Sequence, residues 1–209
     1  MGDGKGVEAL PAHWWLIPKL TYHSLPWTGD SGNTPRLVAF ALANKQGFDA
    51  VVFLDGDNWM DPEHLANMVA LQQSRKSDIV TCPRRLLRSD NLEVLAAEDT
   101  IDSDGKRFND MNCYFITRPA FFVLHAFLLE PQEFGVLSDH YLWDAIVKEY
   151  NSFYIPRCVQ PTINYVTTYT WHYILYKQPA PPNSKAFVQG EQGIVLQPCN
   201  VEDFIQLLL

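Results

Sequence analysis

The chain has 209 residues, of which 47% are hydrophobic and 13% aromatic, so it can bury one substantial core as a single domain over residues 1–209. Its formal net charge of −8 argues against nucleic acid or an anionic membrane as the main partner. No apolar run approaches the roughly 20 residues that span a bilayer, and no signal peptide opens the sequence, so no integral membrane segment is expected.

The first quarter of the chain contains one strand pattern and one helix pattern. Residues 14–20 are mostly apolar and predict a short strand. A helix is expected over residues 35–46, because Thr34 suits the N-cap, Pro35 suits the first helical position and Gly47 suits the C-cap.

From residue 50 to residue 82 the pattern alternates between strand and helix. An apolar strand over residues 50–54 precedes a helix from about residue 61 to residue 74, and another strand is expected over residues 78–82. Such alternation is typical of parallel strands joined by right-handed helical crossovers. We therefore predict an α/β fold with a mostly parallel central sheet flanked by helices.

The second half predicts shorter elements. A strand over residues 112–117 leads into an apolar helix over residues 119–128, and a further helix is expected over residues 139–149 with Ser138 as its cap. Short strands, expected to form an antiparallel C-terminal part, follow at residues 153–155 and around residues 165–176. The aromatic side chains of this last segment are interpreted as core or sheet surface.

The most informative feature is the apolar run 51–54, which stops at two carboxylates, Asp55 and Asp57. Asp-x-Asp at the carboxyl end of a strand places oxygen ligands where open α/β sheets bind their ligands. Mg²⁺ or Mn²⁺ held there could clamp a diphosphate, since both metals favour carboxylate and phosphate oxygens. A simple turn is the alternative, because Asp, Gly and Asn are common turn residues.

Three other chemistries fit these residues less well. A calcium loop of the helix-loop-helix kind needs an oxygen ligand and a glycine where Trp59 and Met60 stand. Trp59 also occupies the diagnostic position of haloacid-dehalogenase-like phosphatases, so a phosphohydrolase stays a minor alternative. Residues 29–32 are similar to the nucleophile motif of trypsin-like proteases, but too little sequence precedes them to build the first barrel, so they are interpreted as a loop.

Cysteine spacing indicates neither a zinc site nor a disulfide framework. The four cysteines are widely scattered, at Cys82, Cys113, Cys158 and Cys199, and none belongs to a Cys-x-x-Cys motif. We therefore expect reduced, mostly buried thiols in a cytoplasmic protein.

Several segments in a fixed order resemble family-two-type glycosyltransferases with the GT-A fold. An arginine-bearing helix, the strand ending in Asp55-Gly56-Asp57 and the helix start at residues 61–62 resemble the central segment of the family. Residues 112–121 resemble the strand-to-helix segment on the acceptor side, and residues 138–143 resemble a later acidic motif that begins a helix. The resemblance covers residues 33–150 and rests on the order and spacing of these motifs.

The resemblance implies a metal-dependent, inverting glycosyltransferase that moves a sugar from a nucleotide-diphosphate donor, UDP-type in preference, to a hydroxyl acceptor. Mn²⁺ or Mg²⁺ would neutralise the leaving diphosphate. Asp57 is then the primary metal ligand, with Asp55 nearer the ribose or bound through water, and His172 as a third ligand. Asp139, kept ionised at a helix start, would take the proton of the acceptor hydroxyl.

Other residues have implied roles that compete with structural ones. Arg36 could contact the donor's phosphates or base, or be a solvated helix residue. Asp110 and Asn112 would hydrogen-bond sugar hydroxyls. Asp139 could instead only support the Ser138 cap, and His172 could be a satisfied structural residue.

Departures from the family pattern leave a second class of protein open. Family members usually open with a nucleotide-contacting strand and a second strand that carries another acidic motif, whereas only 54 residues precede Asp55 and contain no such unit. The later acidic motif reads Ser-Asp-His at residues 138–140 in place of the commoner Glu-Asp-acidic pattern. A non-catalytic, degenerate transferase that binds nucleotide or sugar, with its N-terminal nucleotide-binding unit shortened or missing, is therefore the alternative.

Overall fold

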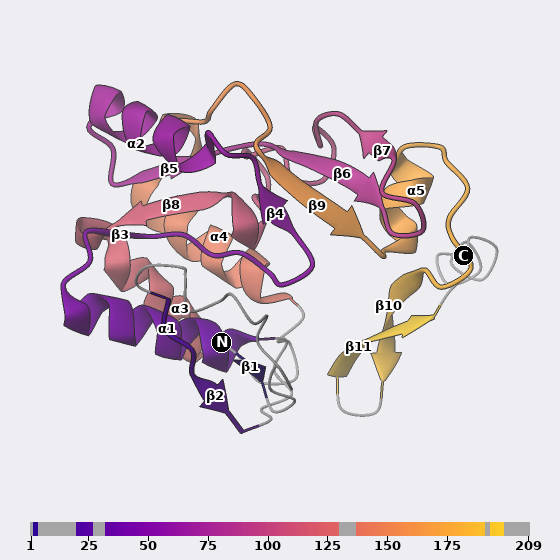
Figure 1. Ribbon diagram of the computed structural model, residues 1–209, viewed down its shortest axis with the longest axis horizontal. Coiled ribbons are helices and arrows are strands. Elements are labelled where there is room, and N and C mark those ends of the chain that lie inside the picture. The colour runs from indigo at the N-terminus through magenta and orange to yellow at the C-terminus, as the bar shows by residue number, and fades with distance from the viewer. Residues whose placement is uncertain (1, 4–19, 27–31, 130–136, 191–192, 199–209) are drawn as a thin grey trace.

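The computed structural model describes residues 2–3, 20–26, 32–129, 137–190 and 193–198, which form a mixed α/β structure (Figure 1). The elements of its first half are β1 (Gly2–Asp3), β2 (Ser24–Leu25), α1 (Asn33–Gln46), β3 (Ala50–Val51), β4 (Trp59–Met60), α2 (His64–Arg75), β5 (Ile79–Thr81), β6 (Arg84–Arg88) and β7 (Val94–Ala96). Those of the second half are η2 (Met111–Cys113), β8 (Tyr114–Thr117), η3 (Arg118–His125), α3 (Ala126–Leu129), α4 (Ser138–Tyr150), η5 (Ser152–Tyr154), β9 (Ile163–Thr167), α5 (Thr170–Leu175), β10 (Lys185–Gly190) and β11 (Gly193–Pro198).

The central sheet has the strand order β3-β8-β5. β8 pairs antiparallel with both neighbours, so the structure does not show the mostly parallel central sheet that we expected, although β3 and β5 run parallel to each other on either side of β8. The pattern did not indicate that β8 would insert between them. Most ladders among the described residues are antiparallel, β6 with β9 and β1 with β2 being the parallel pairs.

The two faces of this sheet bury two separate cores, because successive side chains of a strand point to opposite faces. Ile79 and Ile116 are paired across the sheet and pack with α1, α3 and α4 on one face. Val80 packs with Met68 of α2 and with Cys82 on the other face. Figure 1 shows the resulting layers, with α2 on one side of the sheet and α1, α3 and α4 on the other.

A second sheet of order β4-β9-β6-β7 lies beside the first (Figure 1). Two short connections lead from the first sheet to the second, residues 52–58 between β3 and β4 and residues 82–83 between β5 and β6. The candidate residues Asp55 and Asp57 lie on the first of these crossings, so they stand at the junction of the two sheets. β10 and β11 form an antiparallel hairpin, at residues for which the sequence predicted no strand.

The helices α1, α2 and α4 lie where the sequence predicted them, but two capping predictions were wrong. α1 begins at Asn33 after the left-handed residue Gly32, so Thr34 lies inside the helix, whereas Gly47 is the C-cap as predicted. α4 begins at Ser138, whose side chain therefore does not cap it, and Leu137 stands at the N-cap position. Both errors follow from reading the first polar residue as a cap, when the helix extends one or two residues further.

Three further predictions need correction. The strand expected at residues 153–155 is the 3₁₀ helix η5, and the expected strand at residues 165–176 is strand only to Thr167. The rest of that segment forms α5. The prediction failed because the local pattern of this aromatic segment does not distinguish a short helix from a strand. The apolar helix expected at residues 119–128 is mostly the 3₁₀ helix η3, continued by α3. The strand predicted at residues 14–20 and the loop at residues 29–32 lie largely outside the described residues.

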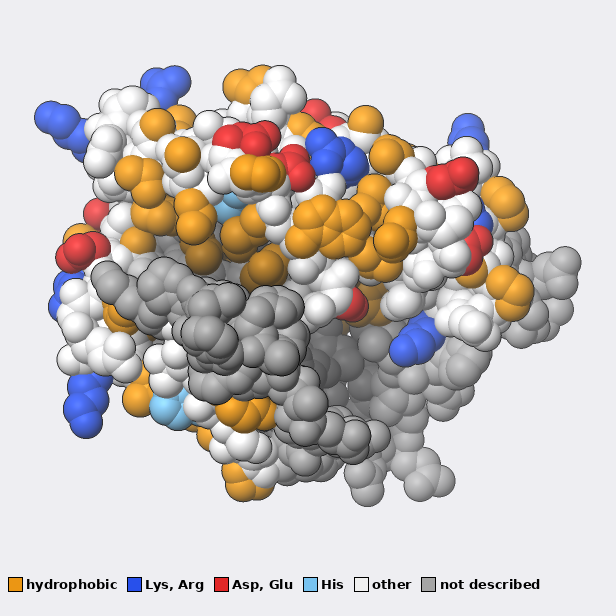
Figure 2. Space-filling view, viewed as in Figure 1, with side chains coloured by type: hydrophobic (Ala, Val, Ile, Leu, Met, Phe, Trp, Pro, Cys, Tyr) orange, Lys and Arg blue, Asp and Glu red, His pale blue; other side chains and the backbone are white. Residues whose placement is uncertain are grey.

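The aromatic segment is mostly packed into the fold, as predicted. Tyr173 is fully buried, whereas Trp171 is exposed. On the face drawn in Figure 2, hydrophobic side chains gather where β4 and β9 lie in Figure 1. Trp59 of β4 is 41% exposed, so an aromatic surface adjoins the crossing that carries Asp55 and Asp57.

Candidate functional site

Asp55 and Asp57 lie in a turn, which agrees with both the metal and the turn interpretation of the sequence. The backbone N–H of Asn58 donates to the Asp55 carbonyl oxygen at 3.1 Å and closes the turn. The Asn58 side chain is buried and accepts the backbone N–H of Val166 at 2.9 Å. β9 thus fixes the end of the turn, while Asp57 at its tip is exposed.

The Asp55 carboxylate is held by two neighbouring segments of the fold. Arg36 of α1 donates to Asp55 Oδ1 at 2.5 Å. Asn112, at the centre of η2, donates from Nδ2 to Asp55 Oδ2 at 3.0 Å and accepts the Asp55 backbone N–H at 2.7 Å. Both carboxylate oxygens of Asp55 therefore already have a hydrogen-bond donor.

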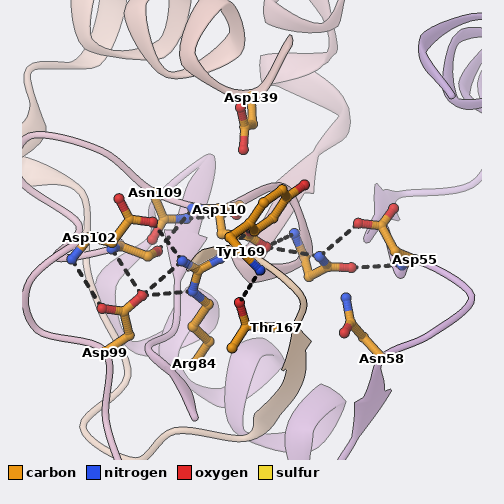
Figure 3. Close-up of polar contacts among 12 residues, drawn as sticks. Asp55, Asn58, Arg84, Asp99, Asp102, Asn109, Asp110, Asp139, Thr167 and Tyr169 are labelled. Atoms are coloured by element: carbon orange, nitrogen blue, oxygen red, sulfur yellow. Dashed lines mark hydrogen bonds and ion pairs between the residues drawn. The ribbon is translucent and has the colours of Figure 1, made fainter. Parts of the chain in front are cut away.

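Beyond Asn112 the network continues into a buried ionic cluster around Arg84 (Figure 3). Asn112 Nδ2 also donates to Asp110 Oδ1 at 2.8 Å, and Arg84 donates to Asp110 Oδ2 at 2.6 Å. Two other nitrogens of the Arg84 guanidinium donate to neighbouring carboxylates, Nε to Asp99 Oδ2 at 2.8 Å and Nη2 to Asp102 Oδ2 at 2.7 Å. We call Arg84, Asp99, Asp102 and Asp110 the Arg84 cluster.

Electrostatics keeps the Arg84 cluster ionised. Burial alone would lower the pKa of Arg84, but Asp110, Tyr165, Asp99 and Asp102 outweigh it and raise the pKa well above its usual value. Burial would likewise raise the pKa of Asp99, yet Arg84, the Asp102 backbone N–H and Tyr176 lower it to about 2. The internal cation is therefore matched by carboxylates that stay charged at neutral pH.

Asp139 behaves in the opposite way. It lies in the first turn of α4, and its side chain points toward the polar network near Tyr169 and Asp110 (Figure 3). Burial and the Asp110 carboxylate raise its pKa to about 7, although Arg84, the His140 backbone N–H and Arg36 lower it. The expectation that the helix start keeps this group fully ionised is wrong, because desolvation and a like charge outweigh the helix dipole.

Asp57 also has a raised pKa. The main cause is partial burial, and the nearby Asp55 and Asp110 carboxylates add to it, against the effect of its own backbone N–H. The Asp57 and Asp139 pKa values therefore both respond to the negative charge of Asp110. We call Asp55, Asp57 and Asp139 the open acids, since the Arg84 cluster does not include them.

His172 contacts the Arg84 cluster, whereas Asp55 and Asp57 lie in the turn after β3. Its Nδ1 lies 2.5 Å from Thr167 Oγ1, and its Nε2 lies 3.1 Å from Arg84 Nη2 and 3.2 Å from Asp102 Oδ2. Within the described ranges, the group of acidic and histidine side chains close enough to share an ion is Asp99, Asp102 and His172. The prediction that His172 completes a metal shell with Asp55 and Asp57 is therefore not supported, and its structural alternative fits better.

Arg84 limits what the Asp99, Asp102 and His172 group can bind. The guanidinium already contacts all three side chains, so a cation there would have to enter beside an existing positive charge. The resident cation of this group is thus Arg84 itself.

Asp110 and Asn112, the predicted sugar contacts, are buried within the protein. Each side-chain polar atom of Asn112 has an internal partner, in Asp55 or Asp110. These two residues therefore position Asp55 and connect it to Arg84, and their contact with sugar hydroxyls stays a prediction.

The sequence reading missed Arg84, Asp99 and Asp102. One signal for Arg84 was available in the sequence. Arg84 is two positions before Leu86 on a strand, so the two side chains point to the same face, and both are buried. The acidic segment 99–104 resembles a solvated loop in sequence, so nothing in it indicated that Asp99 is fully buried.

The residues of the turn fit a divalent cation in part. Asp57 is exposed and close to other negative charge, an arrangement that a cation would relieve. Asp55 fits through water, or directly if Arg36 gives way, since both its oxygens are engaged. One or two carboxylates are enough for Mg²⁺ when water and phosphate oxygens complete the shell.

Comparison with protein-family models, curated proteins and solved structures found no match for this chain. Among the helices that the structure describes, none is both long enough and apolar enough to cross a bilayer.

Proposed function

We propose that the chain is a metal-dependent glycosyltransferase that transfers a sugar from a nucleotide-diphosphate donor to a hydroxyl acceptor, with a GT-A-like sheet arrangement. The observation that carries the proposal is the convergence of Asp139 on the junction that also carries Asp55 and Asp57. Asp139 has a pKa of about 7, the value that suits a general base near neutral pH. The parallel orientation of β3 and β5 supports the sheet arrangement.

In this proposal each open acid has a separate task. Asp139 accepts the proton of the acceptor hydroxyl, which then displaces the diphosphate from the sugar carbon with inversion. Asp57 is the primary ligand of Mn²⁺ or Mg²⁺, and a bound metal would neutralise the charge of the leaving diphosphate. Asp55 is fixed by Asn112, so it offers a stationary acceptor for the donor's ribose or for a metal-bound water.

Arg36 fits a second task in the same site. Its guanidinium contacts Asp55 at 2.5 Å, at the place where the phosphates of a donor would approach Asp57. Exchange of this contact for a phosphate would be favourable, because Arg binds phosphate oxygens bidentately. UDP-type donors remain our preference on the sequence resemblance alone.

One observation favours a second function, a nucleotide or sugar binder without turnover. Asp55 already has an internal cation in Arg36, and the neighbouring acids have Arg84. Such a site can be stable without metal, as expected if transfer chemistry had been lost. A phosphohydrolase is less well supported, because a nucleophilic Asp55 needs a carboxylate oxygen free of the contacts with Arg36 and Asn112.

The proposal is tested by calorimetry of UDP and other nucleoside diphosphates with and without Mn²⁺. Asp57→Asn should weaken Mn²⁺-dependent nucleotide binding at least about tenfold, since even outer partners of metal ligands cost 10- to 100-fold. Asp49→Asn is the matched control, because Asp49 is also exposed and stands just before β3. Equal Mn²⁺-dependent affinities in the wild type and Asp57→Asn would refute the ligand assignment.

A further inference from the structure

Two buried cysteines face each other across the central sheet. Thr81 of β5 pairs with Tyr114 of β8, and the backbone N–H of Cys82 donates to the Cys113 carbonyl oxygen at 3.0 Å. Cys82 and Cys113 are therefore the next opposed pair of this antiparallel ladder. Opposed residues project to the same face, and their Cα atoms are about 5.5 Å apart in a hydrogen-bonded pair. That separation lies within the range that a disulfide bridges.

The thiols lie on the face of the sheet that α2 covers. Both residues are fully buried and pack with Met68 and Ile163. Backbone geometry and packing thus keep the two thiols together without requiring a movement of either strand.

His64, the first residue of α2, supplies a basic group to this pocket. Its side chain is fully buried, and Nδ1 lies 2.7 Å from Thr162 Oγ1. Nε2 is buried and has no hydrogen-bond partner among the described residues. An unsatisfied buried ring nitrogen is costly, so it marks a group that can accept a proton from a neighbouring donor.

The pKa of Cys82 agrees with this arrangement. The Cys113 thiol is the main cause that lowers it to about 6, with His64 and Arg157 adding to the effect, although burial opposes them. Burial and Cys82 raise the pKa of Cys113 well above its usual value. The pair therefore loses its first proton easily and its second with difficulty.

We propose that Cys82 and Cys113 form a dithiol site that a peroxide oxidises to an intramolecular disulfide, with His64 as proton acceptor. In the first step the Cys82 sulfur attacks hydrogen peroxide, the O–O bond breaks, and a sulfenic acid and water form. His64 carries the Cys82 proton to the departing hydroxide. In the second step Cys113 sulfur attacks the sulfenic sulfur, and its own proton leaves with the hydroxyl as a second water. Two thiols are oxidised and one peroxide is reduced.

Cys158 provides an internal contrast. It is only half-buried, but burial and Cys82 raise its pKa to about 11, so it stays a thiol near neutral pH. Its sulfur lies 3.5 Å from Met68 Sδ. Accessibility alone predicts that Cys158 reacts before the buried pair, whereas our proposal predicts the reverse order.

The test uses the full chain in a Cys199→Ser background, treated with hydrogen peroxide and labelled with maleimide after denaturation. We expect Cys82 and Cys113 to lose label together, the protein to become two hydrogen atoms lighter, and peptide mapping to join these two residues. Cys158 should keep its label through this phase. A product without a Cys82–Cys113 link, or earlier loss of label at Cys158, would overturn the proposal.

Three variants separate the roles. Cys113→Ser should stop the reaction at a sulfenic acid that dimedone traps on Cys82, and Cys158→Ser should leave the rate unchanged. His64→Gln should slow disulfide formation severalfold, because the variant lacks the ring nitrogen that accepts the Cys82 proton and helps to lower the Cys82 pKa. Thermal melts identify any variant that fails to fold, and the mapping of the background protein does not depend on them. An unchanged rate in folded His64→Gln would contradict the role of His64.

Discussion

The Arg84 cluster and the open acids contain the same residue type at one sheet junction, yet their protonation differs. Around Arg84, Asp99 and Asp102 have lowered pKa values. Asp57 and Asp139, outside the cluster, have raised pKa values. The comparison indicates that carboxylates paired with a buried cation stay ionised and serve a structural role. Carboxylates outside that pairing have raised pKa values, so they can exchange protons near neutral pH.

The sharpest way to break this comparison is to remove the cation. Arg84→Met keeps much of the apolar volume but leaves three carboxylates without their partner, so the free energy of unfolding should fall by about 3–5 kcal/mol. Urea denaturation at pH 7 measures this change. The control is Arg107→Met, which removes an exposed arginine from its pair with Asp104 and should leave the denaturation midpoint unchanged. Equal stability of Arg84→Met and wild type would mean that the cluster is not held together by its cation.

A second variant tests the open acids through pH. The folded-state pKa of Asp139, about 7, lies above its ordinary value of 3.8, so the folded protein binds this proton more tightly than the unfolded chain does. The resulting stability is fully present below about pH 4 and is lost as the pH rises toward 7. Asp139→Asn has no such loss, so relative to wild type it should gain up to about 4 kcal/mol between pH 4 and pH 8, because each unit of pKa shift is worth about 1.4 kcal/mol.

Thermal and urea melts across that pH range measure the gain, with the exposed Asp144→Asn on the same helix as control. If Asp139 is also the base, the stabilised variant should release nucleoside diphosphate from a donor and acceptor about 10²- to 10⁴-fold more slowly. A pH-independent difference between Asp139→Asn and wild type would show that the folded protein does not raise the pKa of Asp139.

The smallest expected effect concerns Arg36. Asp55 is one of the open acids, but like the carboxylates of the Arg84 cluster it is paired with an arginine. Arg36→Ala frees Asp55 Oδ1 from an ion pair worth about 1 kcal/mol, so affinity for Mn²⁺ alone should rise about fivefold. Affinity for UDP with Mn²⁺ should fall in the same variant if Arg36 contacts the donor phosphates. Lys45→Ala, at the exposed end of the same helix, is the control for charge alone. Unchanged Mn²⁺ affinity would place Asp55 outside the metal site.

Local sequence signals predicted the elements that depend on local physics. The C-cap at Gly47, the helix over residues 64–75 and the strand over residues 79–81 follow from backbone conformation and apolar spacing, which a short window contains. The same windows could not reveal that β8 inserts between β3 and β5, because strand order is decided by contacts between distant segments.

The candidate site shows the same division. Asp55 and Asp57 were found because a strand end and a carboxylate pair are adjacent in sequence. The role of Asn112 depends on a partner 57 positions away, and the contact of Arg84 with His172 spans 88 positions. The burial of Arg84 could therefore be predicted locally only from the alternation of buried and partly exposed positions at the start of its strand.

These separations also describe how the molecule must assemble. The Arg84 cluster with its histidine joins β6, the loop after β7, the turn before β8 and α5, so it cannot close until the second half of the chain has reached the first. Contacts between residues so far apart in sequence are slow to form, because the chain entropy is lost before the contacts repay it. We therefore expect the contact of α5 with the Arg84 cluster to form late in folding, after the carboxylates of residues 99–110 have met Arg84.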